Sequence, residues 1–321
     1  MPVARIVMSA IPDGAACYFC LGEEADEEGM PLVRDCSCRG DSAGFAHLSC
    51  LTKYAEQKSK QAGDGDLDAF STPWKLCNNC KQPFQNQLSI DMASACYLFA
   101  ETTYGHAGNS KCDKMKVIDS LRSKIRVLSN TVDKELVKVE MTILLNKMIS
   151  MVDQTKTDLK MSRWIHMPKG SEEYEYYEVL CGNYEAYAYL KLGVLLLMWD
   201  SSEEEFKTMI THYKKARAIY NLVDMKDKAE QMDTLISLCS IEKQAANNKD
   251  ASSTTERNYV LQFTKSTYEQ YLNTQGMNSA GTIESGLLYA KRLRDANHCI
   301  ESERFVTQLA TISRRVHGPD H

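Results

Sequence analysis

Apolar residues recur in steps of three and four along most of the chain after residue 84. The longest such run contains Ile118, Leu121, Ile125, Leu128, Val132, Leu136, Val139 and Ile143. This spacing places the side chains on one stripe of an α-helix, and strand-like alternation is absent there. The run therefore predicts a long amphipathic helix. A helix of a packed bundle is the commoner explanation, and an oligomerisation seam is the alternative.

The same spacing predicts further helices in the rest of this region. They are expected over residues 184–199, 203–221, 226–242, 256–272, 285–297 and 301–316. Ser201 and Ser202, followed by three glutamates, indicate a helix start, because a serine cap and first-turn acids both suit the N-terminal end of the helix dipole. Only Pro168 and Pro319 fall beyond residue 84. Residues 89–321 are therefore predicted to be all-α, as an array of helical hairpins.

A faint internal repeat supports a stacked array. Small and apolar residues at five positions recur 93 residues later: Leu190, Gly193, Tyr213, Ala216 and Ile219 return as Ile283, Gly286, Val306, Leu309 and Ile312. Two or three helical hairpins fit between them, as in α-solenoids. The last ten residues, ISRRVHGPDH, resemble the close of a tetratricopeptide hairpin of the kinesin-light-chain type. The resemblance implies a protein-binding array, and the absence of a following repeat predicts truncation at the C-terminus.

The first quarter of the chain has a different character. Residues 1–13 are expected to be a flexible lead-in, and the polar stretch 57–71 a loop. Seven cysteines and one histidine between residues 17 and 80 form four short pairs with the spacing C-x2-C-x15-C-x1-C-x8-H-x2-C-x26-C-x2-C. They are Cys17, Cys20, Cys36, Cys38, His47, Cys50, Cys77 and Cys80. Two tetrahedral zinc ions need eight such ligands. The segment 14–88 is therefore predicted to be a zinc-binding domain that holds two Zn²⁺ ions.

Each pair supplies half of a tetrahedron, so adjacent and interleaved pairings are both conceivable. The one-residue gap between Cys36 and Cys38 is too short for a typical independent clamp that is followed by its own histidine and cysteine. A crossed arrangement tolerates this gap. We therefore assign one zinc to Cys17, Cys20, His47 and Cys50, and the other to Cys36, Cys38, Cys77 and Cys80.

Charge and composition narrow the function classes. The net charge is −5, and residues 13–86 account for it with twelve acidic against seven basic residues. A basic stripe is missing, so nucleic acid is a poor candidate partner. The N-terminus lacks the continuous apolar core of a signal peptide, and the longest apolar run, 194–199, is too short to span a bilayer. Reduced thiols and a soluble cytoplasmic or nuclear protein are expected.

The zinc segment resembles a known family at residues 35–51, DCSCRGDSAGFAHLSCL. This stretch is similar to the core of the RING-CH (RING-variant, C4HC3) zinc finger of E3 ubiquitin ligases. PHD fingers share the ligand order but have a wider second pair, and they are the alternative within the zinc class. The resemblance implies a small, loop-rich α+β domain in which the two zinc sites form a cross-brace.

The resemblance also implies a function and a set of partner-binding residues. A RING-CH module binds a ubiquitin-conjugating enzyme and positions its thioester, so no catalytic residue is expected. The surface for the conjugating enzyme and ubiquitin falls on Phe19, on Tyr54 where the family usually has Trp, and on Lys81. Trp74 supplies an alternative aromatic surface or packs under the second zinc loop. The helical region would bind a protein substrate; the alternative is a non-catalytic adaptor with a structural zinc finger.

Overall fold

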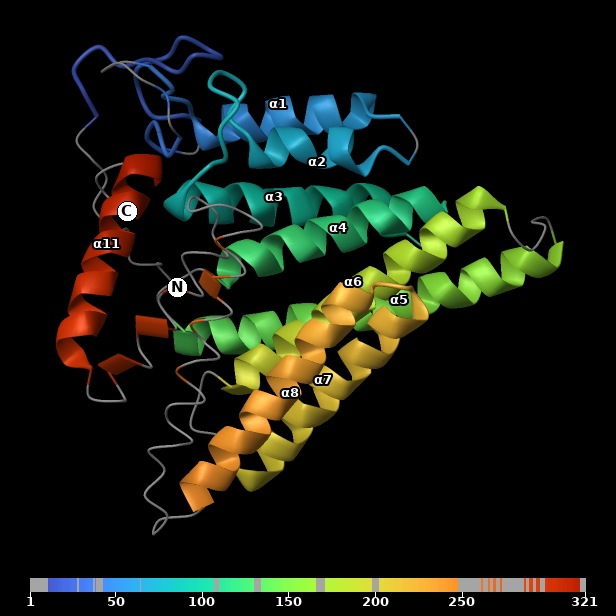
Figure 1. The fold of residues 1–321 in the computed structure, drawn as a ribbon. Coiled ribbons are helices and arrows are strands. Elements are labelled where there is room, and N and C mark those ends of the chain that lie inside the picture. Colours follow the sequence, from blue (N-terminus) through green and yellow to red (C-terminus); the bar gives the residue numbers. More distant parts are fainter. Residues whose placement is uncertain are drawn as a thin grey trace. The chain divides into compact units, whose positions relative to one another are not determined.

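A computed structural model describes most of the chain (Figure 1). The described residues are 11–27, 29–36, 38, 43–63, 65–106, 110–129, 134–165, 171–197, 202–247 and 298–317, with single positions or pairs at 261, 265, 268–269, 272, 286, 289–290 and 293–294. The chain divides into two compact units, residues 1–229 and residues 230–321. Each unit is described by itself.

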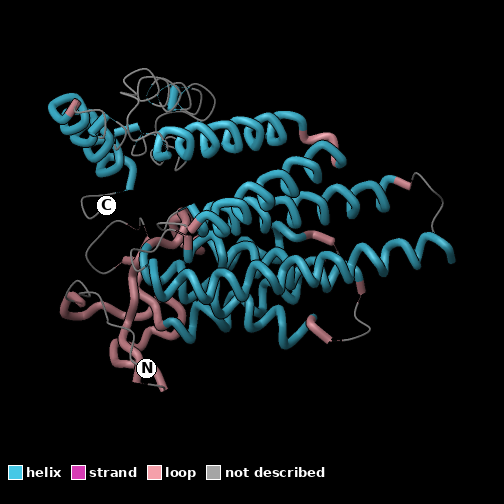
Figure 2. The backbone as a smooth tube through the Cα atoms, turned by 90° about the horizontal axis from the view of Figure 1, so that it is seen from below, coloured by secondary structure: helices cyan, strands magenta, loops and turns pink. Residues whose placement is uncertain are grey.

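The cysteine-rich segment consists mainly of loops, which Figure 2 shows gathered near the N-terminus. Its backbone ladders are limited, among described residues, to two isolated bridges, Val33 with Ala46 and Leu76 with Pro83. Two helices, α1 (Leu48–Gln61) and α2 (Leu67–Lys75), occupy the long interval between the third and fourth ligand pairs.

The expectation of a loop over residues 57–71 was wrong at both ends of that stretch. Only residues 62–66 connect α1 to α2. Ser59 is buried and donates from Oγ to the carbonyl oxygen of Phe70 at 2.7 Å, and so joins the two helices. Asp66 caps α2 by accepting a hydrogen bond from the Ala69 amide at 2.8 Å. Polar composition therefore marked helix caps and an interhelical contact as well as a turn.

The rest of the described chain is helical, which confirms the all-α prediction. Consecutive helices from α3 to α7 pack against one another, as Figure 1 shows for α3 and α4. The helices are α3 (Asn86–Tyr104), α4 (Lys111–Leu128), α5 (Lys134–Ile165), α6 (Glu172–Leu197), α7 (Glu203–Leu222), α8 (Lys226–Asn247) and α11 (Cys299–His317). Across the described residues, no helix is both long and apolar enough to cross a bilayer.

The long apolar stripe belongs to two helices, α4 and α5, and not to one. Its four α4 residues are buried, whereas Val139 and Ile143 in α5 are 64% and 62% exposed. The chain leaves α4 at Ser129, whose amide and hydroxyl both donate to the Ile125 carbonyl oxygen. Because a new helix starts with its own angular register, the buried face of α5 lies elsewhere: Met141, Leu144, Leu145, Met148 and Val152.

The helix start expected near residue 202 is confirmed. Ser202 accepts from the Glu205 amide, and the Glu205 side chain accepts from the Ser202 amide, which completes a capping box. This reciprocal pair satisfies two amides that have no partner within the helix.

Two glycines related by the 93-residue spacing both mark close contacts in the fold. A Cβ on Gly193 would lie 2.4 Å from Tyr213 Cε1, and a Cβ on Gly286 would lie 2.9 Å from Leu309 Cδ1. Each glycine therefore lets a side chain from a later helix approach its backbone. The two contacted residues, Tyr213 and Leu309, are not a pair that the 93-residue spacing relates, so the repeat and its assignment to the tetratricopeptide class stay predictions. The expected helices 256–272 and 285–297 lie largely outside the described residues.

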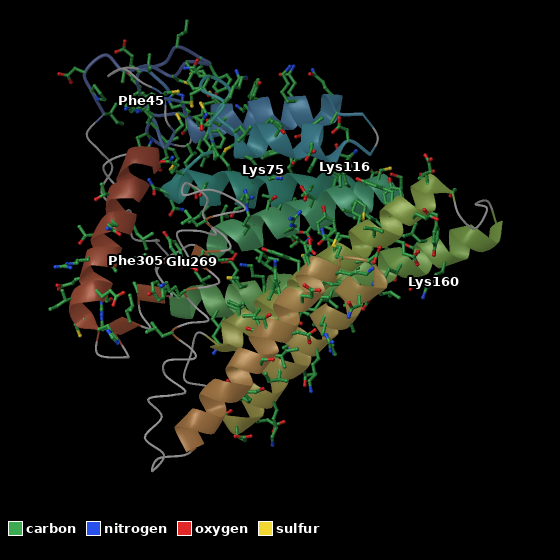
Figure 3. All side chains as sticks on the ribbon, viewed as in Figure 1. Phe45, Lys75, Lys116, Lys160, Glu269 and Phe305 are labelled. Atoms are coloured by element: carbon green, nitrogen blue, oxygen red, sulfur yellow. The ribbon has the colours of Figure 1, made fainter. Side chains whose placement is uncertain are left out.

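The second unit has its own small aromatic contact. Phe305 in α11 (Figure 3) packs edge-on against Tyr268 and Tyr289, with ring centroids 5.0 Å and 5.2 Å away. Ser302, also in α11, donates to the Ala290 carbonyl oxygen at 2.7 Å and is buried. These contacts hold α11 against the segment that precedes it.

One hydrophobic core runs from the cysteine-rich segment into the helices. Phe70 and Trp74 from α2 pack with Phe99 from α3, and the same cluster includes the ligands Cys17, Cys38 and Cys77. The boundary expected between residues 88 and 89 lies inside α3. Lys75 in α2, labelled in Figure 3, forms an ion pair with Asp119 in α4, which adds a polar contact to the apolar one.

Candidate metal centre

The first group of candidate ligands consists of Cys17, Cys20, His47 and Cys50. Their ligand atoms all lie within 4.8 Å of one another. His47 Nδ1 is 3.3 Å from Cys20 Sγ and 3.8 Å from Cys50 Sγ. A tetrahedral zinc with ordinary Zn–N and Zn–S bonds separates such atoms by about 3.5 Å. The group therefore fits one zinc ion without rearrangement.

The backbone fixes which nitrogen of His47 is available to a metal. Nε2 lies 2.7 Å from the carbonyl oxygen of Glu24, so Nε2 carries the proton and donates it. The Nδ1 lone pair then points toward the three sulfurs. A metal-binding histidine commonly donates its other ring N–H in this way.

The acidic run 23–28 contributes to this arrangement. Besides the Glu24 carbonyl, the Asp26 carboxylate accepts from Ser49 Oγ at 2.7 Å and from the Met30 amide at 2.9 Å. These bonds hold the run against the start of α1, beside His47. Runs of charge are usually solvated loop faces, and the exposed Glu23 and Glu27 side chains agree with that. The structural role of Asp26 could be found only from the contact itself.

The second group consists of Cys36, Cys38, Cys77 and Cys80, whose sulfurs also lie within 4.8 Å of one another. Cys38 Sγ and Cys77 Sγ are 3.8 Å apart. Two thiolates bound to one tetrahedral zinc at the usual distance are separated by about 3.8 Å. Four sulfurs with this spacing suit zinc better than a hard cation such as magnesium.

The two Cys-x2-Cys turns have the same local geometry. In the first, the Leu21 amide donates to the Cys17 carbonyl at 2.8 Å; in the second, the Lys81 amide donates to the Cys77 carbonyl at 2.9 Å. Leu21 and Lys81 both adopt positive φ, 60° and 58°. This left-handed residue after each pair turns the chain back over the sulfurs. Neither position is a glycine, so the sequence alone does not indicate this backbone conformation.

Gly44 is a further residue on which the second group depends. Its φ is +82°, and a Cβ there would lie 2.6 Å from Cys38 Cβ and 3.2 Å from Cys36 Sγ. Only glycine combines this backbone conformation with the space the cysteines occupy. A glycine between the second and third ligand pairs is visible in the sequence, but the spacing of the ligands by itself did not indicate that this glycine matters.

Within each group, the neighbouring thiols strongly shift one another's pKa values. The contact with Cys36 is the main reason that the pKa of Cys77 falls to about 4, and the same contact raises the pKa of Cys36. Burial, with the neighbouring Cys20 and Cys17 thiols, raises the pKa of Cys50 to about 12. Burial also acts on Cys17, but the amides of Cys20, His47 and Phe19 outweigh it and lower the pKa to about 7. A divalent cation would compensate the crowded negative charge and release the remaining protons.

The comparison with protein families agrees with this geometry: residues 17–82 match the RING-variant domain model. The cysteine-rich segment is a RING-variant domain. Its two Cys/His groups can hold two zinc ions in the C4HC3 pattern. Neither the curated proteins nor the solved structures gave a match to this chain.

Three of the four residues expected to bind partners are linked through Tyr54 and Asn78 in the RING-variant domain. The Phe19 and Tyr54 rings are 5.1 Å apart. Tyr54 Oη donates to Asn78 Oδ1 at 2.7 Å, and Lys81 Nζ donates to the same oxygen at 3.2 Å. Tyr54 of α1 therefore contacts the loop of the first metal group through Phe19 and the loop of the second through Asn78.

Trp74, the fourth of these residues, lies in the core. Its side chain is 3% exposed, its Nε1 donates to Ser59 Oγ at 2.7 Å, and its ring lies 5.6 Å from that of Phe99. A ring covered in this way cannot offer a surface to a partner. Of the two alternatives for Trp74, the structure therefore favours packing, here of α2 on α3.

An open groove of about 380 Å³ is lined by Tyr54, Asn78 and Lys81. Pro73 of α2 and Leu76, which follows that helix, also line it. The lining residues include two lysines and no carboxylate. The surface around Asn78 is thus a shallow, partly apolar hollow with a basic edge.

Proposed function

We propose that this protein is a RING-type ubiquitin ligase whose zinc domain binds a ubiquitin-charged conjugating enzyme. The observation that carries the proposal is the meeting of Phe19, Tyr54 and Lys81 beside two RING-variant metal groups. RING-variant domains generally work with conjugating enzymes. The two aromatic rings would provide the apolar contact, and Lys81 would contact ubiquitin.

The proposed chemistry is positioning. The conjugating enzyme brings a thioester, and a substrate lysine attacks its carbonyl carbon while the enzyme's cysteine leaves as a thiolate. The ligase would restrain the thioester in a reactive geometry, which can lower a barrier substantially without acid–base chemistry. No residue of this chain is assigned as a nucleophile.

Asn78 gives the proposed surface a particular rigidity. Because its amide oxygen accepts from both Tyr54 and Lys81, the orientation of these side chains is fixed before a partner arrives. Preorganisation of this kind reduces the entropy cost of binding.

In the same proposal, the helical region binds the protein substrate. Consecutive packed helices and the paired glycine contacts at Gly193 and Gly286 are what a helical-hairpin array requires. The core shared by α2 and α3 would hold the zinc domain against the first helix that follows it. Free thiolate ligands are typical of reducing compartments, which supports the cytoplasm or nucleus as the proposed location.

The test is a discharge assay on the full chain. Conjugating enzymes from a panel are charged with ubiquitin, and transfer to free lysine is timed with and without the protein. We expect accelerated discharge with at least one enzyme, and a loss of about tenfold or more in Phe19→Ala and Tyr54→Ala, as for interface hot spots. Each variant is first shown by metal analysis to hold the same zinc as the parent.

The matched control is Tyr176→Ala. Tyr176 lies in α6, is 51% exposed, and is not part of the surface around Asn78. It should discharge ubiquitin at the parent rate. A protein that holds two zinc ions yet accelerates no enzyme of the panel would refute the ligase proposal and leave the adaptor alternative.

A further inference from the structure

We propose that a strip of cations along α6 binds an extended acidic segment of a protein partner. This basic strip consists of Arg122 in α4, Lys191 in α6 and Lys228 at the start of α8. In the proposed function this partner is the substrate, so the inference rests on that function for its role in the cell. Its test measures peptide binding and not ubiquitin transfer, so the two proposals can fail separately.

One face of α6 arranges the three cations in a row. Asn183, Tyr187 and Lys191 follow one another at intervals of four positions, so they lie on the same face of the helix. Lys228 Nζ donates to Asn183 Oδ1 at 2.9 Å. The Arg122 guanidinium lies 5.6 Å from the centre of the Tyr187 ring, and Lys191 Nζ lies 5.8 Å from the same ring. The positive charges therefore follow this face from Asn183 to Lys191.

Further aromatic rings hold two of the cations in place before a partner binds. Arg122 also lies 5.5 Å from the centre of the Tyr184 ring, and Lys228 Nζ lies 5.4 Å from the centre of the buried Tyr220 ring. Such cation–π contacts position a charged group without neutralising its charge. A strip that is ordered in advance loses little conformational freedom when an anion arrives.

The charges of Arg122 and Lys228 are only partly compensated within the described structure. The Asp119 carboxylate is 3.9 Å from Arg122, too far for a hydrogen bond, and it also serves Lys75 and Tyr184. The hydrogen-bond partner of Lys228 is a neutral amide. Burial and the charge of Arg122 lower the pKa of Lys228, as expected for two cations that lie near each other. An anionic partner would relieve this repulsion.

The spacing of the basic strip matches an extended peptide. Four residues of an α-helix rise about 6 Å, and two residues of an extended chain advance about 6.6 Å with their side chains on the same side. Acidic side chains at every second position of a partner would therefore lie opposite successive cations. Nucleic acid fits less well, because its affinity depends on many phosphate contacts and this chain carries a net charge of −5.

The probe is a fluorescein-labelled peptide, Glu-Ser-Glu-Ser-Glu, titrated with the zinc-loaded full chain and followed by fluorescence anisotropy. We expect saturable binding that weakens as the salt concentration is raised. Arg122→Gln and Lys228→Gln should each weaken binding by about fivefold, the effect of losing one well-placed charge pair. Circular dichroism first shows that each variant keeps the helical content of the parent.

The matched control is Lys207→Gln. It removes one positive charge from α7, on an exposed side chain that pairs with Glu203 at 3.9 Å and is not part of the basic strip. This variant should bind the peptide with the affinity of the parent. An equal loss in Lys207→Gln would show unspecific attraction and overturn the proposal, as would unchanged binding in both strip variants.

Two comparisons on the unaltered protein keep the proposal testable if the strip variants fold poorly. A peptide of the same composition in the order Glu-Glu-Glu-Ser-Ser, and a single-stranded oligonucleotide of equal charge, should both bind several-fold more weakly. Equal affinity for the two peptides, or tighter binding of the oligonucleotide, overturns the proposal.

The outcome is separable from that of the discharge assay. Peptide binding at the basic strip without ubiquitin discharge would support this inference and refute the ligase proposal. Discharge without peptide binding would refute this inference alone.

Discussion

Lys75 and Asp119 form an ion pair between the RING-variant segment and the helical region, with 3.5 Å between Nζ and Oδ2. Asp119 also accepts a hydrogen bond from Tyr184 in α6 at 3.0 Å and is largely buried. One carboxylate therefore connects α2, α4 and α6. Beside it, the aromatic residues of α2 pack on α3. These contacts make the metal groups and the first helices parts of one cooperative structure.

The ion pair should therefore contribute to the stability of both parts. Asp119→Asn keeps the shape and an acceptor for Tyr184 but leaves Lys75 without its carboxylate. We expect the free energy of unfolding to fall by about 2 kcal/mol, which is below the usual cost of breaking a fully buried pair because Lys75 is partly exposed. Urea unfolding followed by tryptophan fluorescence and by helical circular dichroism measures it. The exposed Asp227→Asn should change stability by less than about 0.5 kcal/mol.

Removal of zinc should affect helices that contain no ligand. Phe70 and Trp74 are held between the metal groups and Phe99 of α3, so loss of the metal removes support from α3. With excess chelator, we expect a lower melting temperature and loss of part of the helical circular dichroism, both restored by zinc. Helical signal and melting temperature that are unchanged in the metal-free protein would show that the shared core has no energetic importance.

Gly44→Ala should disable the second metal group while sparing the first. The added Cβ would collide with Cys38 and crowd Cys36, at a backbone conformation that alanine disfavours. Metal analysis should find one zinc per chain in place of two. Gly29→Ala is the matched control, because Gly29 has a φ of +76° and open space around its Cβ position. Equal loss of zinc in both variants would attribute the effect to backbone strain alone.

Gly193→Ala should separate α6 from α7. Its Cβ would lie 2.4 Å from the Tyr213 ring, which is fully buried and has little room to move. We expect a loss of about 1–3 kcal/mol, the usual cost of overpacking a core. Chemical denaturation measures it, with Gly63→Ala as a control, since Gly63 lies in the α1–α2 connection with nothing near its Cβ position. Unchanged stability of Gly193→Ala would contradict the contact.

Much of the metal site could be read from local spacing. Cys17 and Cys20, like Cys77 and Cys80, must lie close together because two intervening residues bring both sulfurs to one ion. The grouping in the structure is the crossed one that the short gap between Cys36 and Cys38 favours. The helices from α6 to α8 also agreed with apolar spacing and with the serine cap at Ser202.

The sequence by itself determined the ligand types, the RING-variant pattern and the helical character of the chain after residue 84, because these depend on residues a few positions apart. Only the tertiary structure decided that Trp74 is buried, that the apolar stripe divides between α4 and α5, that Phe19 packs beside Tyr54, and that Tyr54 and Lys81 share Asn78. Each of these outcomes depends on contacts between residues distant along the chain. Local patterns fix which face of an element is apolar, but the packing of whole elements decides what that face meets and which polar atoms find partners.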